Sequence, residues 1–325
     1  MSTNKKLYIC VTDGCSLACK GCYKYLYNIT HPSFLDLNIV RKYINNFLIN
    51  NPNDTLDCTF HGGEPFYIGN LQNYIDLMNE YKAYPQIKWS ATTNLIYKIT
   101  PLHISLFNML SNKFIKTSWD VDDYRFKTSN QLELWENNVK LLLKEGFTIQ
   151  PIITVNNQTI LHDPKELFEY FKNLNIKNIN FERITEAGRA TQVKVKPTNR
   201  ETDDWLYKVY LLNKEYNFDI PIFNELLESY KIGYSGCRKR ECMQDVRTIN
   251  TDGSIGACPN CSNVYIIDKE GNYNQEQENT LIKMEKDINI QCRCCKFYKI
   301  CHGDCSQLAW DETGCPGLTK ILENI

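Results

Sequence analysis

Residues 7–23 read LYICVTDGCSLACKGCY, a short β-rich run that leads directly into three closely spaced cysteines. The run that ends at Val11 is apolar or aromatic, which is typical of a buried strand. Cys15, Cys19 and Cys22 then follow in a CxxxCxxC pattern, with no fourth cysteine in the same loop. The stretch therefore predicts a strand whose carboxyl end carries a loop of three thiols.

The same alternation of strand and helix recurs along residues 7–183. We expect strands at residues 7–11, 56–60, 87–93, 114–119, 148–155 and 177–182, with helices between them and a sixth helix at residues 203–216. These six βα units fall short of a full TIM barrel, so an α/β fold with a partial (β/α)6 TIM-like barrel is the leading architecture. A doubly wound sheet would give a similar pattern, although no G-x-G-x-x-G turn follows the first strand.

Local signals mark some of the helix boundaries. Apolar side chains from Phe34 onward recur at helical spacing. The pairs Thr-Pro at residues 100–101 and Asp-Pro at residues 163–164 each place a capping side chain before a proline, which suits the first helical position.

Both architectures place functional residues just beyond the carboxyl ends of the strands. In this chain polar residues gather at each of those positions. They are the cysteine loop, His61-Gly62-Gly63-Glu64-Pro65, Thr93-Asn94, Ser118-Trp119-Asp120, Asn156 and Glu182-Arg183, in strand order.

Charge and composition narrow the class of protein. Lys plus Arg number 37 and Asp plus Glu number 38, so the net charge of −1 gives no reason to expect nucleic acid or an anionic membrane as partner. The hydrophobic content of 42% is too high for a disordered chain. No apolar run approaches the roughly 20 residues that span a bilayer. Without a secretory signal at the N-terminus, we expect a cytoplasmic protein.

The 15 cysteines fall into two groups, five in residues 1–58 and ten between Cys237 and Cys315. In a reducing compartment, close-spaced thiols are better interpreted as metal ligands or redox catalysts than as disulfides. Three thiolates on one loop can hold three corners of a cubane iron–sulfur cluster and leave its fourth iron open. A zinc site completed by a distant ligand, or a thioredoxin-like CxxC, would use the same spacing.

CxxxCxxC followed by an aromatic residue, with GGEP after the second strand, resembles the radical S-adenosylmethionine (radical SAM) superfamily. The resemblance implies that Cys15, Cys19 and Cys22 bind a [4Fe-4S] cluster whose open iron is chelated by SAM. The implied SAM contacts are Tyr23 beside the adenine, Gly62, Gly63, Glu64 and Pro65 around the methionyl ammonium, Ser118 and Asp120 on the ribose and carboxylate, and further contacts from Asn94 and Asn156. The usual Ser-x-Asp-Gly ends here in Val121, and an Asn at a strand end also commonly forms a turn.

The later cysteines resemble the SPASM extension of radical SAM enzymes that modify peptides and proteins. Cys242, Gly253 and Cys258 are followed by a C-x2-C-x5-C-x3-C run and a last cysteine. In that family two auxiliary [4Fe-4S] clusters are fully ligated, which makes three clusters in all. The resemblance assigns Cys237, Cys242, Cys258 and Cys305 to the first and Cys292, Cys295, Cys301 and Cys315 to the second. We therefore expect a radical SAM barrel at residues 1–200, a connecting helical segment at 201–236 and a cysteine-rich SPASM domain at 237–325.

Four cysteines remain. Cys10 and Cys58 lie in predicted strands, where we expect small buried core residues. Cys261 and Cys294 neighbour assigned ligands and could replace them, and Cys261 could also give a hydrogen atom to a substrate radical. A zinc ribbon on the CxxC pairs is the alternative, but it would leave six of the later cysteines without a role.

Together the resemblances imply a radical SAM peptide maturase, an oxidoreductase. Its 5'-deoxyadenosyl radical would abstract hydrogen from a ribosomally made precursor peptide, and the auxiliary clusters would accept the remaining electron. A net oxidation, such as a thioether or carbon–carbon crosslink, is therefore favoured. Anaerobic sulfatase maturation, which forms formylglycine, is the alternative, although those enzymes generally have an Asp where this chain has Pro259.

The implied partners follow from this chemistry. An electron donor such as flavodoxin or ferredoxin would reduce the cluster. Because the first strand begins at about residue 7, a leader peptide would be recognised by another surface or by a separate leader-binding protein. The alternative from another class is a non-catalytic iron–sulfur electron carrier or a zinc-binding module, neither of which needs GGEP.

Overall fold

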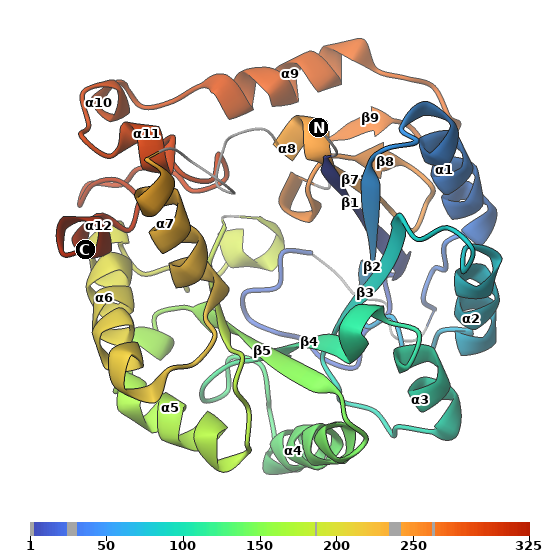
Figure 1. Ribbon diagram of the computed structural model, residues 1–325, viewed down its shortest axis with the longest axis horizontal. Coiled ribbons are helices and arrows are strands. Elements are labelled where there is room, and N and C mark those ends of the chain that lie inside the picture. The colour runs from blue at the N-terminus through green and yellow to red at the C-terminus, as the bar shows by residue number, and fades with distance from the viewer. Residues whose placement is uncertain (1–2, 25–30, 186, 234–241, 262–263) are drawn as a thin grey trace.

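The computed structural model describes residues 3–24, 31–185, 187–233, 242–261 and 264–325. Within these residues, nine strands form one sheet in the order β6-β5-β4-β3-β2-β1-β7-β8-β9. The six parallel strands of the N-terminal region are β1 (Asn4–Thr12), β2 (Thr55–Gly62), β3 (Ile87–Thr93), β4 (Phe114–Trp119), β5 (Thr148–Val155) and β6 (Asn180–Arg183), shown in Figure 1. All six strands predicted from the sequence are confirmed.

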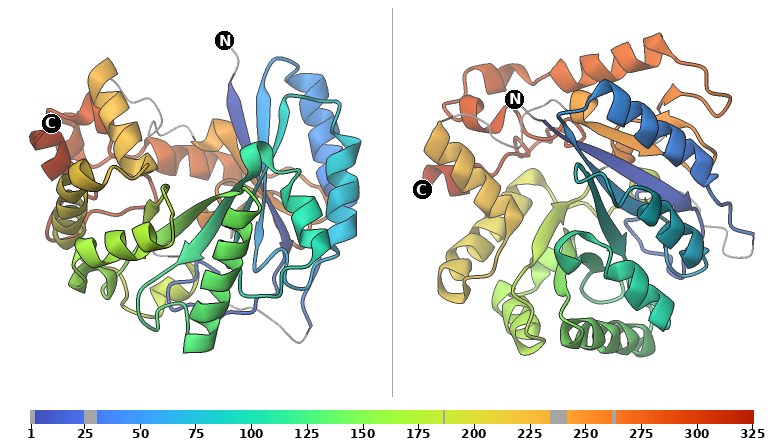
Figure 2. Two further views of the ribbon diagram at one scale, coloured as in Figure 1. Left: turned by 60° about the horizontal axis from the view of Figure 1, so that its bottom comes forward. Right: turned by 45° about the vertical axis from the view of Figure 1, so that its right-hand side comes forward.

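The strand order decides between the two architectures that the sequence left open. β1 to β6 lie side by side in chain order, whereas the order in a doubly wound sheet reverses at a switch point. The six strands curve around one interior, and β7 occupies the other side of β1 (Figure 2). The partial (β/α)6 barrel is therefore confirmed.

Helices cover the outer face of the curved sheet (Figures 1 and 2). They are α1 (Leu37–Asn50), α2 (Leu71–Glu80), α3 (Pro101–Phe107), α4 (Ser129–Lys144), α5 (Pro164–Asn173) and α6 (Asn199–Tyr216). The 3-10 turns η1 (Ser111–Lys113), η2 (Thr159–Leu161) and η3 (Gly188–Thr191) lie in the connections.

The two predicted proline starts are confirmed, and two other boundaries differ from expectation. α1 begins at Leu37 because Asp36 caps it, so Phe34 lies before the helix. Phe34 instead forms an isolated β-bridge with Thr12. α6 begins four residues before the predicted start at residue 203, because Thr198 and Glu201 form a capping box.

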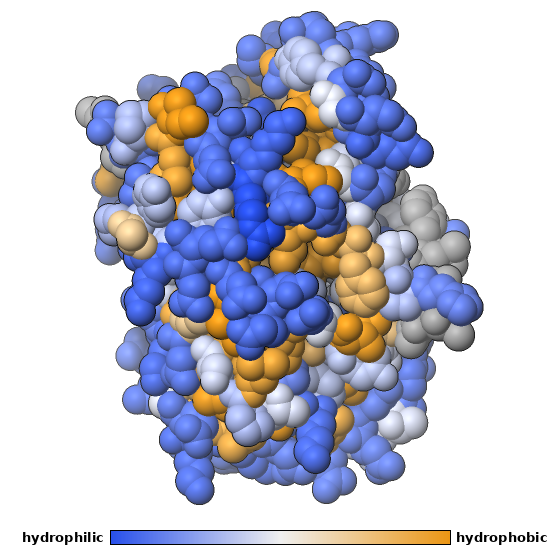
Figure 3. All heavy atoms as spheres, turned by 90° about the vertical axis from the view of Figure 1, so that its right-hand side faces the viewer, coloured by the Kyte–Doolittle hydropathy of each residue, from blue (hydrophilic) through white to orange (hydrophobic). Residues whose placement is uncertain are grey.

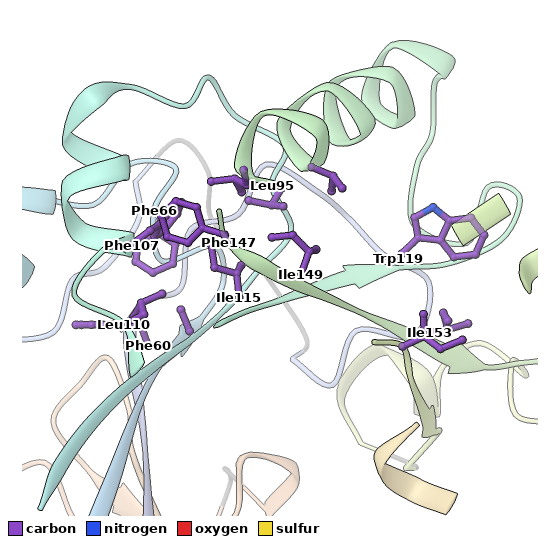
Figure 4. Close-up of a cluster of buried hydrophobic side chains, with 14 of the residues drawn as sticks. Phe60, Phe66, Leu95, Phe107, Leu110, Ile115, Trp119, Phe147, Ile149 and Ile153 are labelled. Atoms are coloured by element: carbon purple, nitrogen blue, oxygen red, sulfur yellow. The ribbon is translucent and has the colours of Figure 1, made fainter. Parts of the chain in front are cut away.

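Alternate side chains of a strand point to opposite faces, and the outer face of this sheet is apolar. On β4, Ile115 and Trp119 are buried, while Lys116 and Ser118 on the opposite face are half-buried. The outer cluster includes Phe60, Phe66, Phe107, Ile115 and Ile149 (Figure 4). Burial of each such side chain contributes about 1.5–3 kcal/mol, so this layer holds the helices on the sheet.

The inner face of the barrel is polar. The Ser90 hydroxyl bonds both Thr59 Oγ1 at 2.7 Å and Asp57 Oδ1 at 2.8 Å. Beside them the ring of Tyr8 packs edge-on against His61. A full TIM barrel fills this space mainly with Val, Ile and Leu. The interior of this open barrel is therefore lined by groups that can form hydrogen bonds with a polar ligand.

The region after α6 extends the same sheet. After α7 (Pro221–Ile232) and α8 (Cys242–Asp245), β7 (Val246–Ile249) pairs in parallel with β1, and β8 (Ile255–Gly256) and β9 (Tyr265–Ile267) continue antiparallel. The turn η4 (Pro259–Cys261) joins β8 to β9, and α9 (Gln275–Lys286), α10 (Ile290–Arg293), α11 (Tyr298–Cys301) and α12 (Thr319–Glu323) follow. The domain boundaries at residues 200 and 236 stay predictions, and the sheet is continuous across them.

Polar contacts tie the C-terminal segment back to α6. Asn199 Nδ2 donates to the backbone oxygens of Ala309 and Gly314, at 3.1 and 2.8 Å. Asp203 Oδ2 accepts from Thr319 Oγ1 at 2.9 Å. These contacts hold the end of the chain, red in Figure 1, against the barrel.

Figure 3 shows the side of the molecule that carries α1 and α2, where apolar side chains surface in patches between polar ones. A groove of about 500 Å³ between α1 and the β8–β9 hairpin is lined in part by Ile39, Tyr43 and Ile255. None of the helices in the described ranges is long and apolar enough to cross a membrane.

Candidate functional site

The cysteine loop lies at the carboxyl edge of the barrel, directly after β1. Cys15 and Cys19 are buried, and Cys22 is half-buried. The three thiols lie near enough to one another that Cys19 and Cys22 raise the pKa of Cys15. The structure thus gathers the three cysteines of the CxxxCxxC pattern at the predicted edge.

Loops that follow three other strands hold the cysteine loop in place through the backbone. The bonds are Glu64 N to Gly14 O at 2.7 Å after β2, Lys20 N to Tyr124 O at 3.1 Å after β4, and Arg189 N to Cys22 O at 2.8 Å after β6. A loop bonded on three sides keeps its shape without regular secondary structure. The positions of the three thiols are therefore set by loops from several strands at the barrel edge.

Close backbone contact explains the glycines of the GGEP motif. Gly62 has φ of 128°, a left-handed conformation that favours glycine, and a Cβ there would lie 2.5 Å from Thr12 O. A Cβ at Gly63 would lie 2.0 Å from Gly14 O. Any side chain at either position would push the β2 loop away from the cysteine loop.

Nitrogen donors approach two of the sulfurs. Arg125 Nη1 lies 3.2 Å from Cys19 Sγ, and Asn94 Nδ2 lies 3.6 Å from Cys15 Sγ. Burial raises the pKa of Cys15 to about 12, and nearby Glu64 adds to the rise. Burial also raises the pKa of Cys19, against the opposing charge of Arg125. Metal binding at this loop would therefore release protons, and the donors would stabilise the resulting thiolates.

Glu64 is a buried carboxylate in a cage of donors. It accepts from Thr93 Oγ1 at 2.7 Å, from Asn94 N at 2.5 Å and from Phe66 N at 3.3 Å. Burial raises its pKa to about 7, although these bonds lower it. Pro65 begins the turn that follows. The carboxylate is thus held in one orientation and has no ion-pair partner among the described residues, which suits it to receive a cation.

Asp120 is also buried and is paired with Arg125. Asp120 Oδ2 accepts from Arg125 Nε at 2.7 Å, and Oδ1 accepts from Thr154 N at 2.7 Å. Ser118 lies two residues earlier, half-buried on the inner face. Through Arg125 the carboxylate of Asp120 is linked to the sulfur of Cys19. Sequence reasoning missed Arg125, because no spacing motif singles it out from the charged residues around it.

The two asparagines differ in their surroundings. Asn94 points its amide at Cys15 and, at 3.2 Å, at Ser16 Oγ. Asn156 is fully buried, and its side-chain oxygen accepts from the backbone N–H groups of Gln158 and Thr159. Asn156 therefore forms the turn after β5, while Asn94 lies at the cysteine loop. SAM contacts from either one stay predictions.

Tyr23 is bonded to His61, a residue to which the resemblance assigns no SAM contact. Its hydroxyl lies 2.8 Å from His61 Nδ1, and the two rings meet edge-on. Burial lowers the pKa of His61 to about 3, so the imidazole is neutral. The position of His61 directly before Gly62 was the available signal. Packing of Tyr23 on an adenine stays a prediction.

The cysteines assigned to the first auxiliary cluster come together in space. Burial raises the pKa of Cys242 to about 12, and Glu285, Cys258 and Cys305 add to the rise because they lie close. Cys237, the fourth assigned ligand, lies outside the described residues. The chain thus brings Cys242, Cys258 and Cys305 to one place from separate segments, and their role as ligands stays a prediction.

The cysteines assigned to the second auxiliary cluster form another group. Burial raises the pKa of Cys315, and the thiols of Cys292 and Cys295 add to the rise. A Cβ at Gly317 would lie 3.4 Å from Cys301 Sγ and 3.6 Å from Cys315 Sγ, so these sulfurs share one neighbourhood. The four members are close in space, and their ligand role likewise stays a prediction.

Of the four cysteines outside the assigned sets, Cys10 and Cys58 lie where we expected them. Cys10 and Cys58 are fully buried on β1 and β2, which confirms them as core residues. Cys261 shares a hydrogen bond with Cys258, and Cys294 is exposed. No disulfide joins any two of the described cysteines. In the same ranges no three His, Cys, Asp or Glu side chains converge on a point that one metal ion could occupy.

Comparisons with known proteins find similarity both in sequence and in structure. Residues 6–132 match the 4Fe-4S single cluster domain. The cysteine-type anaerobic sulfatase-maturating enzyme of Clostridium perfringens is 22% identical over an alignment that covers 90% of this chain and 86% of that protein.

Solved structures share the fold. Native anSMEcpe with bound AdoMet has a TM-score of 0.77 at 17% identity, covering 99% of this chain and 95% of that one. Streptococcus suis SuiB bound to precursor peptide SuiA has a TM-score of 0.65 at 16% identity, covering 94% of this chain and 72% of that one. The matches agree with the CxxxCxxC and GGEP motifs. These matches bear out the resemblance to the radical SAM superfamily and its SPASM subgroup.

Proposed function

We propose that this chain is a radical SAM maturase that acts on a ribosomally made precursor peptide and installs an oxidative crosslink, a thioether or a carbon–carbon bond. The observation that carries the proposal is the convergence of three thiols, a buried carboxylate and a half-buried arginine at one edge of the barrel. Cys19, Glu64 and Arg125 exemplify this convergence. An electron carrier would need the thiols but not the caged carboxylate.

The donor set fits a [4Fe-4S] cluster that carries SAM. Three thiols from one loop can ligate three irons, and Asn94 and Arg125 supply N–H donors to the sulfurs, as outer residues of metal sites commonly do. The buried Glu64 would gain a partner from the methionyl ammonium. When bound, the cluster and SAM supply the hydrogen-abstracting radical, and the chain supplies binding, orientation and exclusion of water.

The residues around the loop divide these tasks. Glu64, fixed by its three donors, would bind the amino end of SAM. Asp120, paired with Arg125, would face the ribose or carboxylate together with Ser118, while Arg125 supports the Cys19 sulfur. His61 holds the hydroxyl of Tyr23, which fixes the ring that would lie by the adenine.

Three clusters rather than one best account for the C-terminal thiols. The described residues contain two separate groups, around Cys258 and around Cys301, in addition to the N-terminal loop. Two auxiliary clusters would take up the electron that a substrate radical loses after its new bond forms. A flavodoxin or ferredoxin would supply the electron that starts the reaction.

The polar inner face supports a peptide substrate. Side chains such as Asp57, Ser90 and Lys116 could bond the backbone and polar side chains of an extended segment. The structural relative SuiB is described in complex with a precursor peptide, SuiA. A separate leader-binding protein would deliver the substrate if this chain itself does not bind the leader peptide.

Formylglycine formation is the second candidate. The Clostridium perfringens relative, a cysteine-type anaerobic sulfatase-maturating enzyme, covers most of this chain and favours it. The residue after Cys258 weighs against it, because Pro259 opens the turn η4 and offers no carboxylate. A hydrazide probe separates the candidates, since formylglycine carries an aldehyde and a crosslink does not.

The test is iron and sulfide content of anaerobically reconstituted protein, together with 5'-deoxyadenosine formed from SAM and a strong reductant. We expect about twelve irons in the wild type and about eight in the Cys15→Ala/Cys19→Ala/Cys22→Ala variant, which should not cleave SAM. Cys294→Ala, an exposed cysteine outside the assigned sets, is the matched control and should retain both. Zinc in place of iron, or clusters without SAM cleavage, would leave an electron carrier or binding module.

A further inference from the structure

We propose that Arg183 is a positioning residue that anchors the loops of both auxiliary clusters to the barrel and raises the reduction potential of the two clusters. The inference rests on the proposed three-cluster function and deepens it. Arg183 is the last residue of β6, so it stands at the same edge of the sheet as the cysteine loop.

The guanidinium of Arg183 forms hydrogen bonds with two segments of the C-terminal region. Arg183 Nη1 and Nη2 donate to Asp304 Oδ2 and Oδ1, at 2.9 and 2.8 Å, in a bidentate pair. Nη1 also donates to Pro316 O at 2.6 Å. Asp304 precedes Cys305 of the first group, and Pro316 follows Cys315 of the second. A single side chain on the barrel thus contacts a neighbour of a ligand from each cluster.

The segment that Arg183 grips is conformationally strained. His302, Gly303 and Asp304 have φ of 51°, 78° and 59°, three successive left-handed residues of which two carry a Cβ. Asp304 Oδ1 also accepts from Cys305 N at 2.7 Å. The bonds of Asp304 therefore hold a turn that Cys301 and Cys305 flank, one cysteine from each group.

The charge of Arg183 reaches both groups of thiols. Its side chain is 9% exposed and that of Asp304 is 4% exposed, so solvent screens the pair weakly. Burial opposes the charge of Arg183, but Asp304 and the nearby thiols of Cys305 and Cys301 outweigh it and raise its pKa. The guanidinium is thus a fixed positive charge between the two cluster sites.

The direction of the effect follows from electrostatics. Reduction adds an electron to a cluster, so a nearby cation stabilises the reduced form and a nearby anion destabilises it. Loss of the charge of Arg183 should lower both auxiliary potentials. Loss of the charge of Asp304 should raise them. If Arg183 and Asp304 had only a structural role, both variants would shift the auxiliary potentials in the same direction or lose similar amounts of iron.

The experiment compares the full chain, anaerobically reconstituted, as wild type, Arg183→Gln, Arg183→Lys and Asp304→Asn. Arg41→Gln is the matched control, since Arg41 lies on α1 in an exposed pair with Glu80 and its loss changes the net charge equally. Iron and sulfide are counted first. Redox titrations followed by electron paramagnetic resonance then give the potentials of the clusters whose spectra do not change when SAM is added.

We expect opposite shifts in Arg183→Gln and Asp304→Asn, potentials near those of the wild type in Arg183→Lys, and no shift in Arg41→Gln. Unchanged potentials in Arg183→Gln at full iron content would overturn the inference and leave the three-cluster function standing. Shifts in one direction for both charge variants would also overturn it. A wild type with about four irons would reject the three-cluster proposal itself.

Discussion

Replacing Glu64 by glutamine tests the SAM site most directly, because it changes one charge and almost no volume. The carboxylate bonds Thr93, Asn94 and Phe66 from within the protein, and burial raises its pKa to about 7. The pKa of this acid is thus raised, so its ionised form grows as the pH rises through about 7. Only that form pairs well with an ammonium group.

The size of the effect follows from these contacts. A hydrogen bond to a charged group contributes about 1.5–3 kcal/mol, so Glu64→Gln should raise the Kd for SAM by roughly 10- to 150-fold at a pH where Glu64 is ionised. The ionised fraction rises from about one-tenth at pH 6 to about nine-tenths at pH 8. The ratio of variant to wild-type Kd should therefore increase by as much as about tenfold over that range.

The assay is SAM binding to the reconstituted proteins by equilibrium dialysis between pH 6 and pH 8.5. Taking the ratio cancels the titration of SAM itself, which is common to both proteins. Glu80→Gln on α2, an exposed glutamate, is the matched control and should bind as the wild type does. A ratio that stays constant with pH, or wild-type affinity in Glu64→Gln, would refute the assigned role.

Three further predictions follow from the same edge of the barrel. Arg125→Met leaves Asp120 buried and unpaired, so the free energy of unfolding measured with urea should fall by about 3–5 kcal/mol. The exposed Arg41→Met should lower it by only about 0–1 kcal/mol, and equal losses in the two variants would contradict a buried ion pair. Gly63→Ala forces a Cβ to within 2.0 Å of Gly14 O and should displace the cysteine loop, lowering iron by about four per chain, whereas Gly271→Ala, which meets no atom within 4 Å, should retain its iron. Cys58→Ala removes a core thiol and should lower the stability to unfolding by about 0.5–3 kcal/mol without loss of iron; lost iron would mean that Cys58 is a ligand.

Much of the barrel could be predicted because its signals are local. Strand periodicity and proline starts act within a few residues, and the six strands lie where the pattern predicts them. The start of α6 was missed although Thr198 and Glu201 form a capping box, a local signal that was available. The order of the strands could not be predicted from local signals, because the periodicity is the same for a partial barrel and a doubly wound sheet.

The candidate site divides in the same way. Cys15, Cys19 and Cys22 are recognisable because a cluster needs ligands at short spacing along one loop. Arg125 carried no signal, because an arginine in a sequence is usually a solvated charge. Arg183 was marked only by its position just beyond a predicted strand, which does not name its partner. Each acquires its role when folding buries it against an aspartate, Asp120 in one case and Asp304 in the other.

By itself the sequence determined the βα alternation, the loop of three thiols and a second region rich in cysteine, since these depend on spacing along the chain. The division of the later cysteines into two sets came from the resemblance to a known family. Only the tertiary structure decided which thiols share a neighbourhood and which charges accompany them. Arg183 and Asp304 are 121 residues apart, and their pairing exists only once the barrel edge and the C-terminal segment have excluded water between them. Desolvation turns such distant charges into strong partners, and desolvation is a property of the folded chain.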